Sequence, residues 1–129
     1  MKYLLDTNII VDYLRGKTDL PESFIKEGSA ISSITLAELY YGAYKSKNPH
    51  EGIKEISEIL SDFDLNVIEL QDGVKIYGRI KASLESKGTK LDEMDLLIAA
   101  TAMDKKLTLV TKNIKHFSRI PKLKIKKGL

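Results

Sequence analysis

The sequence predicts an α/β fold, a sandwich in which helices cover both faces of a central, mainly parallel sheet. Short apolar runs suited to buried strands alternate along the chain with longer segments of helical character. That alternation is typical of parallel sheets, whose strands are joined by helices. The 129 residues, 43% hydrophobic and 30% charged, match one globular domain, so we expect a single domain spanning residues 1–129.

Four apolar runs are short enough to be buried strands: 3–5, 30–34, 67–68 and 107–110. Helices are expected between and after them, at about 9–14, 22–26, 36–45, 53–60, 74–84 and 96–105. In the segment 74–84, Val74, Tyr77, Ile80 and Leu84 recur at spacings of three and four, which predicts one buried stripe. Gly88 follows as the expected stop signal.

Composition excludes several classes of protein. The chain has no cysteine, so disulfide scaffolds, thiol nucleophiles and cysteine-ligated metals are ruled out. Its two histidines, His50 and His116, are too few for a zinc site built on several imidazoles. The most apolar stretch, 96–103, is far shorter than the roughly 20 residues of a membrane span. Since Asp6 also interrupts any signal-peptide core, we expect a cytoplasmic protein without a membrane segment.

Charge is divided unevenly along the chain. The net charge of +3 combines −4 over residues 1–111 with +7 over residues 112–129, a basic segment that contains no acid. An acidic body with a basic end fits a carboxylate-lined site beside a strip that binds a polyanion. It fits a solvated tail equally well, and the tail alone does not decide between them.

Three acidic residues stand at junctions between predicted elements. Asp6 ends the first strand, Glu38 follows the second strand by one short turn, and Asp95 opens an apolar helix. In an open parallel sheet these junctions gather along one edge, where ligands bind. Clustered carboxylates repel one another unless a cation neutralises them, and oxygen ligands without thiolates favour Mg²⁺ or Mn²⁺.

Each acid also has a purely structural explanation. Thr35 and Glu38 have the spacing of a capping box, and Asp92 with Asp95 has a weaker form of it. Asp6 could cap the first helix, although its place directly after an apolar strand is less typical of a cap. Capping and metal binding do not exclude each other.

The same residues fall into ordered motifs: Asp6-Thr7-Asn8, Thr35-x-x-Glu38, Asp95-x-x-Ile98-Ala99-Ala100-x-Ala102 and Val110-Thr111-x-Asn113-x-x-x-Phe117. In this order and spacing they resemble PIN-domain ribonucleases of the VapC toxin type, over residues 4 to about 120. The resemblance implies a PIN-like α/β/α sandwich and an endoribonuclease dependent on Mg²⁺ or Mn²⁺. It also implies the toxin of a toxin–antitoxin pair, a homodimer held inactive by a small VapB-like antitoxin.

Carried over by position, the resemblance makes Asp6 and Asp95 the principal metal ligands, and Glu38 a ligand through water or the group that orients the attacking water. Asn113 matches a fourth catalytic position, and Asn8 and Thr111 match residues that support the carboxylates. Relatives often have an acid where this chain has His116, so we expect loose binding of one metal ion. The basic end supplies candidates for RNA contact: Lys112, Lys115, His116 and Arg119.

Other functions stay open at this point. An aspartyl-phosphate phosphatase would need a second Asp where Asn8 stands, and a response-regulator receiver would place its acids in another order. The nearest alternatives are an RNA-processing or DNA-cleaving PIN nuclease outside toxin–antitoxin systems and a catalytically weak module that binds RNA or protein. Tyr40, Tyr41 and Tyr44 are expected in the core or in a subunit interface, and less so in base stacking.

Overall fold

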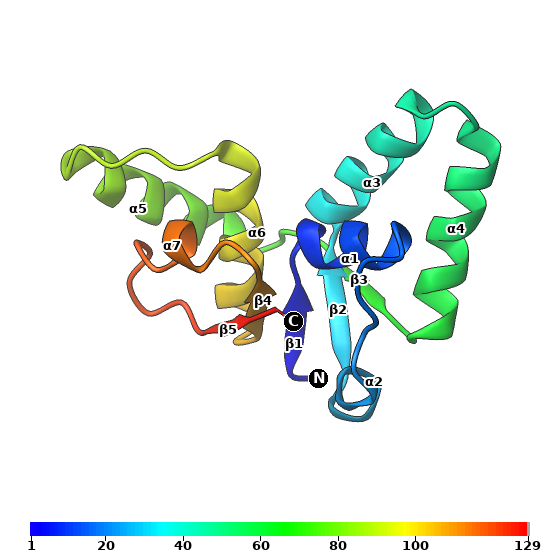
Figure 1. Cartoon of the computed structure of the whole chain (residues 1–129). Coiled ribbons are helices and arrows are strands. Elements are labelled where there is room, and N and C mark those ends of the chain that lie inside the picture. The colour runs from blue at the N-terminus through cyan, green and yellow to red at the C-terminus, as the bar shows by residue number, and fades with distance from the viewer. Residues whose placement is uncertain (129) are drawn as a thin grey trace.

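A five-stranded sheet runs through the middle of the protein (Figure 1). The computed structural model describes residues 1–128, and Leu129, the last residue of the predicted basic segment, lies outside the described residues. All pairings within the sheet are parallel, and the order is β3-β2-β1-β4-β5. The strands are β1 (Tyr3–Leu5), β2 (Ser29–Ser32), β3 (Asn66–Ile68), β4 (Thr108–Thr111) and β5 (Ile125–Lys127).

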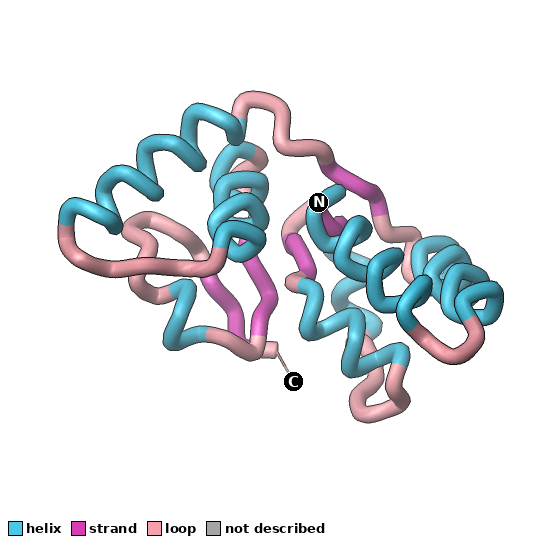
Figure 2. Tube along the Cα trace, turned by 90° about the horizontal axis from the view of Figure 1, so that it is seen from above, coloured by secondary structure: helices cyan, strands magenta, loops and turns pink. Residues whose placement is uncertain are grey.

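Helices form a layer on each side of the sheet, and Figure 2 shows the two groups from above. The helices are α1 (Thr7–Leu14), α2 (Glu22–Glu27), α3 (Ser33–Lys45), α4 (Pro49–Asp62), α5 (Gly73–Ser86), α6 (Glu93–Asp104) and α7 (Ile114–Phe117). The pair α3 and α4 packs with α1 and α2 on one side, and α5 packs with α6 and α7 on the other (Figure 1). The predicted α/β/α sandwich is confirmed.

The strands divide their side chains between two cores. Leu5, Ile31 and Val110 face the core under α1 to α4, whereas Leu4 and Leu109 face the core under α5 to α7. All five side chains are fully buried. Because successive strand residues point to opposite faces, a strand covered on both sides is mostly apolar. This is why β1 and the middle of β2 and β4 appear in the sequence as short apolar runs, with buried Ser29, Ser32 and Thr111 at strand ends.

Most element boundaries lie within a few residues of the prediction, and β1 has the predicted bounds. Two elements of the basic end, α7 and β5, were not predicted. The predicted stripe on α5 is wrong at Val74, which is 56% exposed, although Ile80 and Leu84 are buried. Gly88 has a φ of 72° just past the end of α5, as its role of stop signal requires.

The three tyrosines of α3 are not core residues. Tyr41 and Tyr44 are about two-thirds exposed, and Tyr40 is about one-third exposed. The core interpretation of these residues is therefore wrong, and the interface interpretation is the one that their exposure permits. No helix in residues 1–128 has the length and apolar character needed to cross a bilayer.

The sheet order reverses direction at β1. The chain passes from β1 to β2 and β3 on one side, and later to β4 and β5 on the other. Ligands of open parallel sheets bind at the carboxyl ends of the strands beside such a reversal. The edge beyond β1 and β4 is therefore where the fold favours a functional site.

Candidate active site

A cavity of about 440 Å³ opens at this edge. It collects side chains from the ends of β1 and β4 and from α1, α3 and α6. Its lining includes the predicted residues Asp6, Asn8, Glu38, Asp95, Lys112 and Asn113. Three acids that are up to 89 positions apart in the sequence thus share one cavity. Thr111 is buried behind Asp6, whereas Lys115, His116 and Arg119 are exposed and do not line the cavity.

Asp6 is the most firmly held of the acids. Its Oδ2 accepts hydrogen bonds from the Thr111 hydroxyl at 2.7 Å and from Asn8 Nδ2 at 3.0 Å. Its Oδ1 accepts from the backbone N–H of Thr7 at 2.8 Å, so Asp6 also caps α1. Burial raises the pKa of the carboxyl, and the three hydrogen bonds act in the opposite direction.

Glu38 is positioned by a relay of hydroxyl groups. The Thr7 hydroxyl lies 2.6 Å from Glu38 Oε1 and 3.0 Å from the Thr35 hydroxyl. Because a hydroxyl carries a single proton, Thr7 satisfies both contacts by donating to Glu38 and accepting from Thr35. The relay joins α1 to α3 and fixes one carboxylate oxygen of Glu38. The second oxygen, Oε2, has no hydrogen-bond partner within residues 1–128.

The predicted capping box at Thr35 and Glu38 is wrong. Helix α3 begins at Ser33, and its cap is Ser32, whose hydroxyl accepts from the Thr35 backbone N–H at 3.0 Å. Thr35 therefore lies inside the first turn, and Glu38 lies too far along the helix to reach the unpaired N–H groups at its start. The structure gives Glu38 no capping role, which leaves its place in the cavity as its explanation.

Asp95 is held less firmly than the other acids. It is the third residue of α6, half-buried, and accepts no hydrogen bond from any residue in the described part of the chain. Burial, together with the negative charges of Asp6, Asp92 and Glu38, raises its pKa to about 6. The predicted cap at this helix is Asp92, whose side chain makes no capping hydrogen bond. The start of α6 therefore places a carboxylate under electrostatic repulsion.

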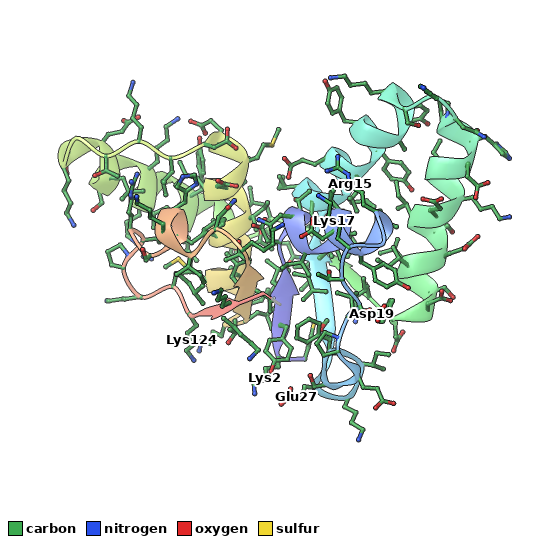
Figure 3. All side chains as sticks on the ribbon, viewed as in Figure 1. Lys2, Arg15, Lys17, Asp19, Glu27 and Lys124 are labelled. Carbon is green, nitrogen blue, oxygen red and sulfur yellow. The ribbon has the colours of Figure 1, made fainter. Side chains whose placement is uncertain are left out.

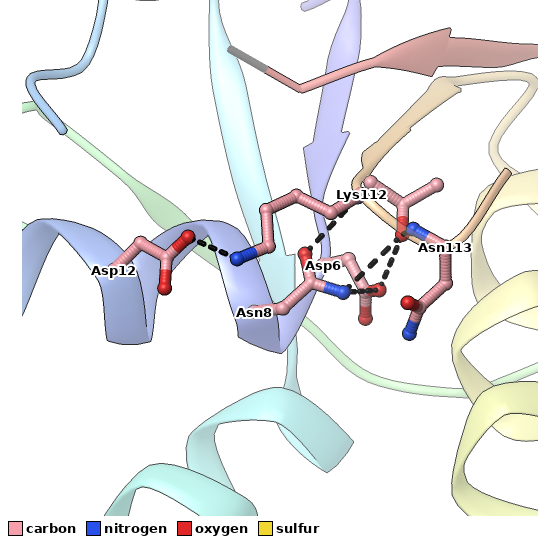
Figure 4. Close-up of polar contacts among 6 residues, drawn as sticks. Asp6, Asn8, Asp12, Lys112 and Asn113 are labelled. Carbon is pink, nitrogen blue, oxygen red and sulfur yellow. Dashed lines mark hydrogen bonds and ion pairs between the residues drawn. The ribbon is translucent and has the colours of Figure 1, made fainter. Parts of the chain in front are cut away.

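The segment after β4 is tied to α1 at two points (Figure 4). The backbone N–H of Lys112 donates to Asn8 Oδ1 at 3.3 Å, and the Lys112 ammonium pairs with Asp12. The next residue, Asn113, donates its backbone N–H to the Thr111 hydroxyl at 3.0 Å, while its side chain is exposed at the cavity. The hydroxyl of Thr111 thus organises both Asp6 and Asn113.

The donor set suits a hard divalent cation because Asp6, Glu38 and Asp95 supply carboxylate oxygens to the lining of the cavity. Burial is the main cause that raises the pKa of Asp95, and the repulsion from neighbouring acids, which raises it further, is what such a cation would relieve. Within residues 1–128, however, no three His, Asp or Glu side chains converge into a ready-made metal-binding group. The three acids share a cavity without already forming one coordination sphere.

Three further charged residues of the cavity were not identified from the sequence: Asp12, Arg15 and Lys17. Asn8, Asp12 and Arg15 are spaced by four and then three positions, so they lie along one face of α1. Once Asn8 was placed at the site, this spacing could have indicated the other two. Lys17 lies beyond the end of the helix, and helical spacing gives no sign of it.

A second, more apolar hollow of about 490 Å³ adjoins the first. Its walls come from α1, α3 and α4 and include Val11, Leu14, Leu39, Ala43 and Ile56. Glu38, Arg15 and Val11 line both hollows, so the two lie side by side. We call the second hollow the apolar groove.

The fold and the acidic cavity define a class of protein. The family described as PIN domain matches residues 3–123. Together with the parallel sheet and the acids at its carboxyl edge, this match shows that the chain belongs to the PIN-domain family.

Within that family the chain groups with VapC ribonucleases. It is 41% identical to ribonuclease VapC2 of Rickettsia felis over 129 residues, which cover 95% of each chain. It is 35% identical to the tRNA(fMet)-specific endonuclease VapC of Salmonella typhimurium over 128 residues, 97% of this chain and 96% of the relative.

Comparison with solved structures also groups the chain with VapC proteins. The VapC-like fold is found in DNA-bound VapBC from Salmonella typhimurium, with a TM-score of 0.92 and 34% identity over 100% of this chain and 99% of the other. It is also found in VapBC2 from Rickettsia felis bound to a promoter DNA fragment, with a TM-score of 0.87 and 38% identity over 98% of each chain. The resemblance found in the sequence motifs is confirmed.

Proposed function

We propose that this chain is a divalent-metal-dependent endoribonuclease that hydrolyses RNA phosphodiesters as the toxin of a toxin–antitoxin pair. One observation carries the proposal: Asp6, Glu38 and Asp95, from three separate elements, line one cavity at the carboxyl edge of the sheet. The ribonuclease names of the VapC relatives support the activity. The proposal places the protein in the cytoplasm, with its RNA substrate. No observation favours a DNA-cleaving or purely binding alternative.

Asp6 and Asp95 are the residues we assign to the cation, with Glu38 acting through water, and Mg²⁺ or Mn²⁺ as the ion. When bound, such a cation would supply charge neutralisation at the phosphate and lower the pKa of a water molecule. The different supports of the two aspartates fit this assignment. Asp6 is fixed in place by three hydrogen bonds, whereas Asp95 lacks such bonds and has a pKa raised by burial and by neighbouring charge.

Glu38 has the position of a group that orients the attacking water. Thr7 holds Oε1, which leaves Oε2 to accept a proton from water in the cavity. Attack in line with the leaving oxygen would yield a 5′-phosphate and a 3′-hydroxyl. Asn113 offers a neutral amide that can donate to a phosphate oxygen without adding negative charge, and Asn8 and Thr111 keep Asp6 in place. Catalysis then rests on positioning and charge neutralisation.

The apolar groove suits a VapB-like antitoxin segment. Its lining has apolar side chains such as Leu14, Leu39 and Ile56, and more acids than bases: Glu38, Glu51 and Glu55 against Arg15 and Lys47. A segment with apolar anchors and basic flanks would complement this surface, and its end would reach Glu38, which borders the cavity. The VapBC titles of the solved structures support a partner of this kind. The exposed Tyr41 and Tyr44 on α3 suit the contact surface of a homodimer.

The decisive experiment incubates the purified chain with total cellular RNA and with initiator tRNA, the substrate named for the Salmonella relative. We expect cleavage with Mg²⁺ or Mn²⁺, none with EDTA, and none by Asp6→Asn. Sequencing the ends should find 5′-phosphates. Co-expression with a small antitoxin encoded next to the gene should suppress cleavage.

Two results would contradict the proposal. Cleavage that persists in EDTA would exclude the metal-dependent reaction. Cleavage that Asp6→Asn retains at the wild-type rate would show that another site, or a contaminating nuclease, is responsible.

A further inference from the structure

Three cationic side chains line the acidic cavity: Arg15, Lys17 and Lys112. Lys112 is already paired with Asp12, whose side chain is only 10% exposed. Arg15 and Lys17 form no ion pair with any acid in residues 1–128, and both are exposed to solvent. The two cations available to a ligand in this cavity are therefore those at the end of α1.

The end of α1 holds these two residues in a defined turn. Gly16 has a φ of 70°, and its N–H donates to Tyr13 O at 3.0 Å, while the Lys17 N–H donates to Asp12 O at 2.9 Å. This pair of hydrogen bonds around a left-handed glycine is a Schellman motif, which reverses the chain at a helix end. As a result, residues on both sides of Gly16 line the same cavity. In Figure 3 Arg15 and Lys17 lie together beside α1, whereas Lys124 lies near β5, away from α1.

The electrostatics of Asp12 are consistent with this arrangement. The Lys112 ammonium is the main cause that lowers the pKa of Asp12, and the charges of Lys17 and Arg15 lower it further. All three cations therefore lie within electrostatic reach of one buried carboxylate. A single negative charge faces three positive ones, which leaves this wall of the cavity net positive, in the same cavity as Asp6, Glu38 and Asp95.

We infer that Arg15 and Lys17 form a phosphate subsite that binds the RNA backbone next to the bond to be cut. Lys112, by contrast, has a structural role and links α1 to the segment after β4. The inference rests on the proposed function. A polyanion entering a cavity with three acids meets repulsion, and two free cations on the adjacent wall offset it. Arg15 also borders the apolar groove, but Lys17 lines only the acidic cavity, which favours RNA over a protein partner as the ligand.

This inference moves the expected RNA contacts away from the basic C-terminal segment. Lys115 and Arg119 lie outside the cavity, and Lys112 inside it is neutralised by Asp12. The path of the RNA is thus assigned to the end of α1 instead of α7. The two paths can be separated because each offers a pair of exposed cations that can be removed without disturbing a buried group.

The experiment compares three double variants that each lose two positive charges. Arg15→Gln/Lys17→Gln removes the subsite, Lys115→Gln/Arg119→Gln removes the α7 path, and Lys122→Gln/Lys124→Gln is the control. Lys122 and Lys124 are exposed and line a separate hollow with Lys106, away from the acids. Cleavage of an oligoribonucleotide gives kcat and KM. Fluorescence anisotropy, with Asp6→Asn added to each variant, gives affinity for uncut RNA across about 50 to 200 mM salt.

We expect the subsite variant to raise KM and Kd about tenfold while kcat stays within about twofold, because the cations bind ground state and transition state alike. The slope of log affinity against log salt should fall by about 1.4, or roughly 0.7 for each phosphate of a single strand that the variant no longer neutralises. The control should change neither quantity by more than about twofold, since its cations lie away from the cavity.

Several outcomes overturn the inference. If the subsite variant behaves like the control while wild type cuts RNA, the subsite is wrong and the proposed function stands. A larger effect from Lys115→Gln/Arg119→Gln would assign the RNA to α7. Unchanged RNA binding with weakened antitoxin binding would assign Arg15 and Lys17 to the protein partner. If wild type neither cuts nor binds RNA, the subsite and the proposed function fail together.

Discussion

The two aspartates of the cavity are held in opposite ways. At the junction of β1 and α1, Asp6 is buried and receives three hydrogen bonds, from Thr111, Asn8 and the Thr7 backbone. At the start of α6, Asp95 is half-buried and receives none from the described residues, and neighbouring acids contribute to its raised pKa. The first region fixes a carboxylate in place before any ligand arrives. The second keeps a carboxylate charged at neutral pH against local repulsion.

This difference suggests that the two regions have different roles in metal binding. A cation bound between the two regions would find one ligand already oriented and another whose repulsion it relieves. Sites that concentrate like charges destabilise the fold when empty, and the cost is recovered on binding. The junction of β1 and α1 should therefore determine where the metal ligands lie. The start of α6 should determine how much metal binding raises the stability of the fold.

The largest effect is expected at the fixed aspartate. Asp6→Asn should lower cleavage by about 1,000-fold or more, because it removes a charge where no other side chain can replace it. The fold should survive, since the amide is close in size to the carboxyl and avoids the burial of a charge. Cleavage rate and thermal unfolding, measured on the same preparation, test both statements. A variant that is unfolded would show that Asp6 supports the sheet edge more than the reaction.

At the start of α6 activity and stability should change in opposite directions. Asp95→Asn should reduce cleavage about 100-fold or more while raising the stability of the metal-free protein at pH 7 to 8. The pKa of Asp95 is about 6 in the folded chain against an ordinary 3.8, so ionisation weakens the fold as the pH rises between these values. The gain should therefore be on the order of 1 kcal/mol above pH 6, after allowance for solvent screening, and vanish below about pH 4.

Urea unfolding at several pH values, with and without Mg²⁺, measures this gain. The control is Asp62→Asn, an exposed aspartate at the end of α4. Mg²⁺ should stabilise wild type more than Asp95→Asn. Equal stabilisation of both proteins by Mg²⁺ would show that Asp95 does not bind the metal. A stability gain that does not change with pH would show that the gain does not come from the ionisation of Asp95.

The fold was more predictable than the walls of the site. Apolar triplets such as 3–5 identify central strands because both faces of the sheet are covered. Strand β5 escaped prediction because it lies at the sheet edge, where Lys124, Lys126 and Lys127 surround one apolar residue. Charged lysines on an edge strand discourage pairing with other chains. The same lysines leave β5 without the apolar run from which the other strands were predicted.

The acids of the cavity could be predicted because strand ends meet at one edge, so a position in the sequence implies a position in space. Of the cations, the sequence predicted only Lys112 at the site, and it did not predict the ion pair of Lys112 with Asp12. Lys17 enters the cavity only because Gly16 reverses the chain, and Lys112 is neutralised only because Asp12 lies beside it in three dimensions. The capping box failed for a related reason, since the choice of Ser32 over Thr35 as cap shifts the start of α3. Such details depend on packing and local turns, which motif spacing does not record.

A smaller effect is expected when the support of Asp6 is loosened. Thr111→Val keeps the shape of the side chain but removes the hydroxyl that donates to Asp6 and accepts from the Asn113 N–H. Asp6 Oδ2 would keep only the hydrogen bond from Asn8, and the Asn113 N–H would lose its acceptor, so the change should cost about 1–3 kcal/mol of stability and activity should fall about tenfold. Thr101→Val is the matched control, because its buried hydroxyl bonds only Leu97 O within α6. Equal losses of activity in both variants would mean that stability alone, and not the geometry of Asp6, explains them.

The smallest effect is expected at the polar contact that joins α5 to the start of α6. Glu93, two residues before Asp95, contacts both Tyr77 and Lys81 of α5. The contact lies at the surface, however, while Leu96 and Ile98 of the same helix are almost fully buried. Exposed ion pairs contribute little, so Glu93→Gln should change cleavage less than about fivefold. Glu85→Gln on α5 serves as the control. A loss of about 100-fold in Glu93→Gln alone would show that this surface contact, and not the packing of Leu96 and Ile98, determines the position of Asp95. Both aspartates would then depend on polar contacts, Asp6 directly and Asp95 through Glu93.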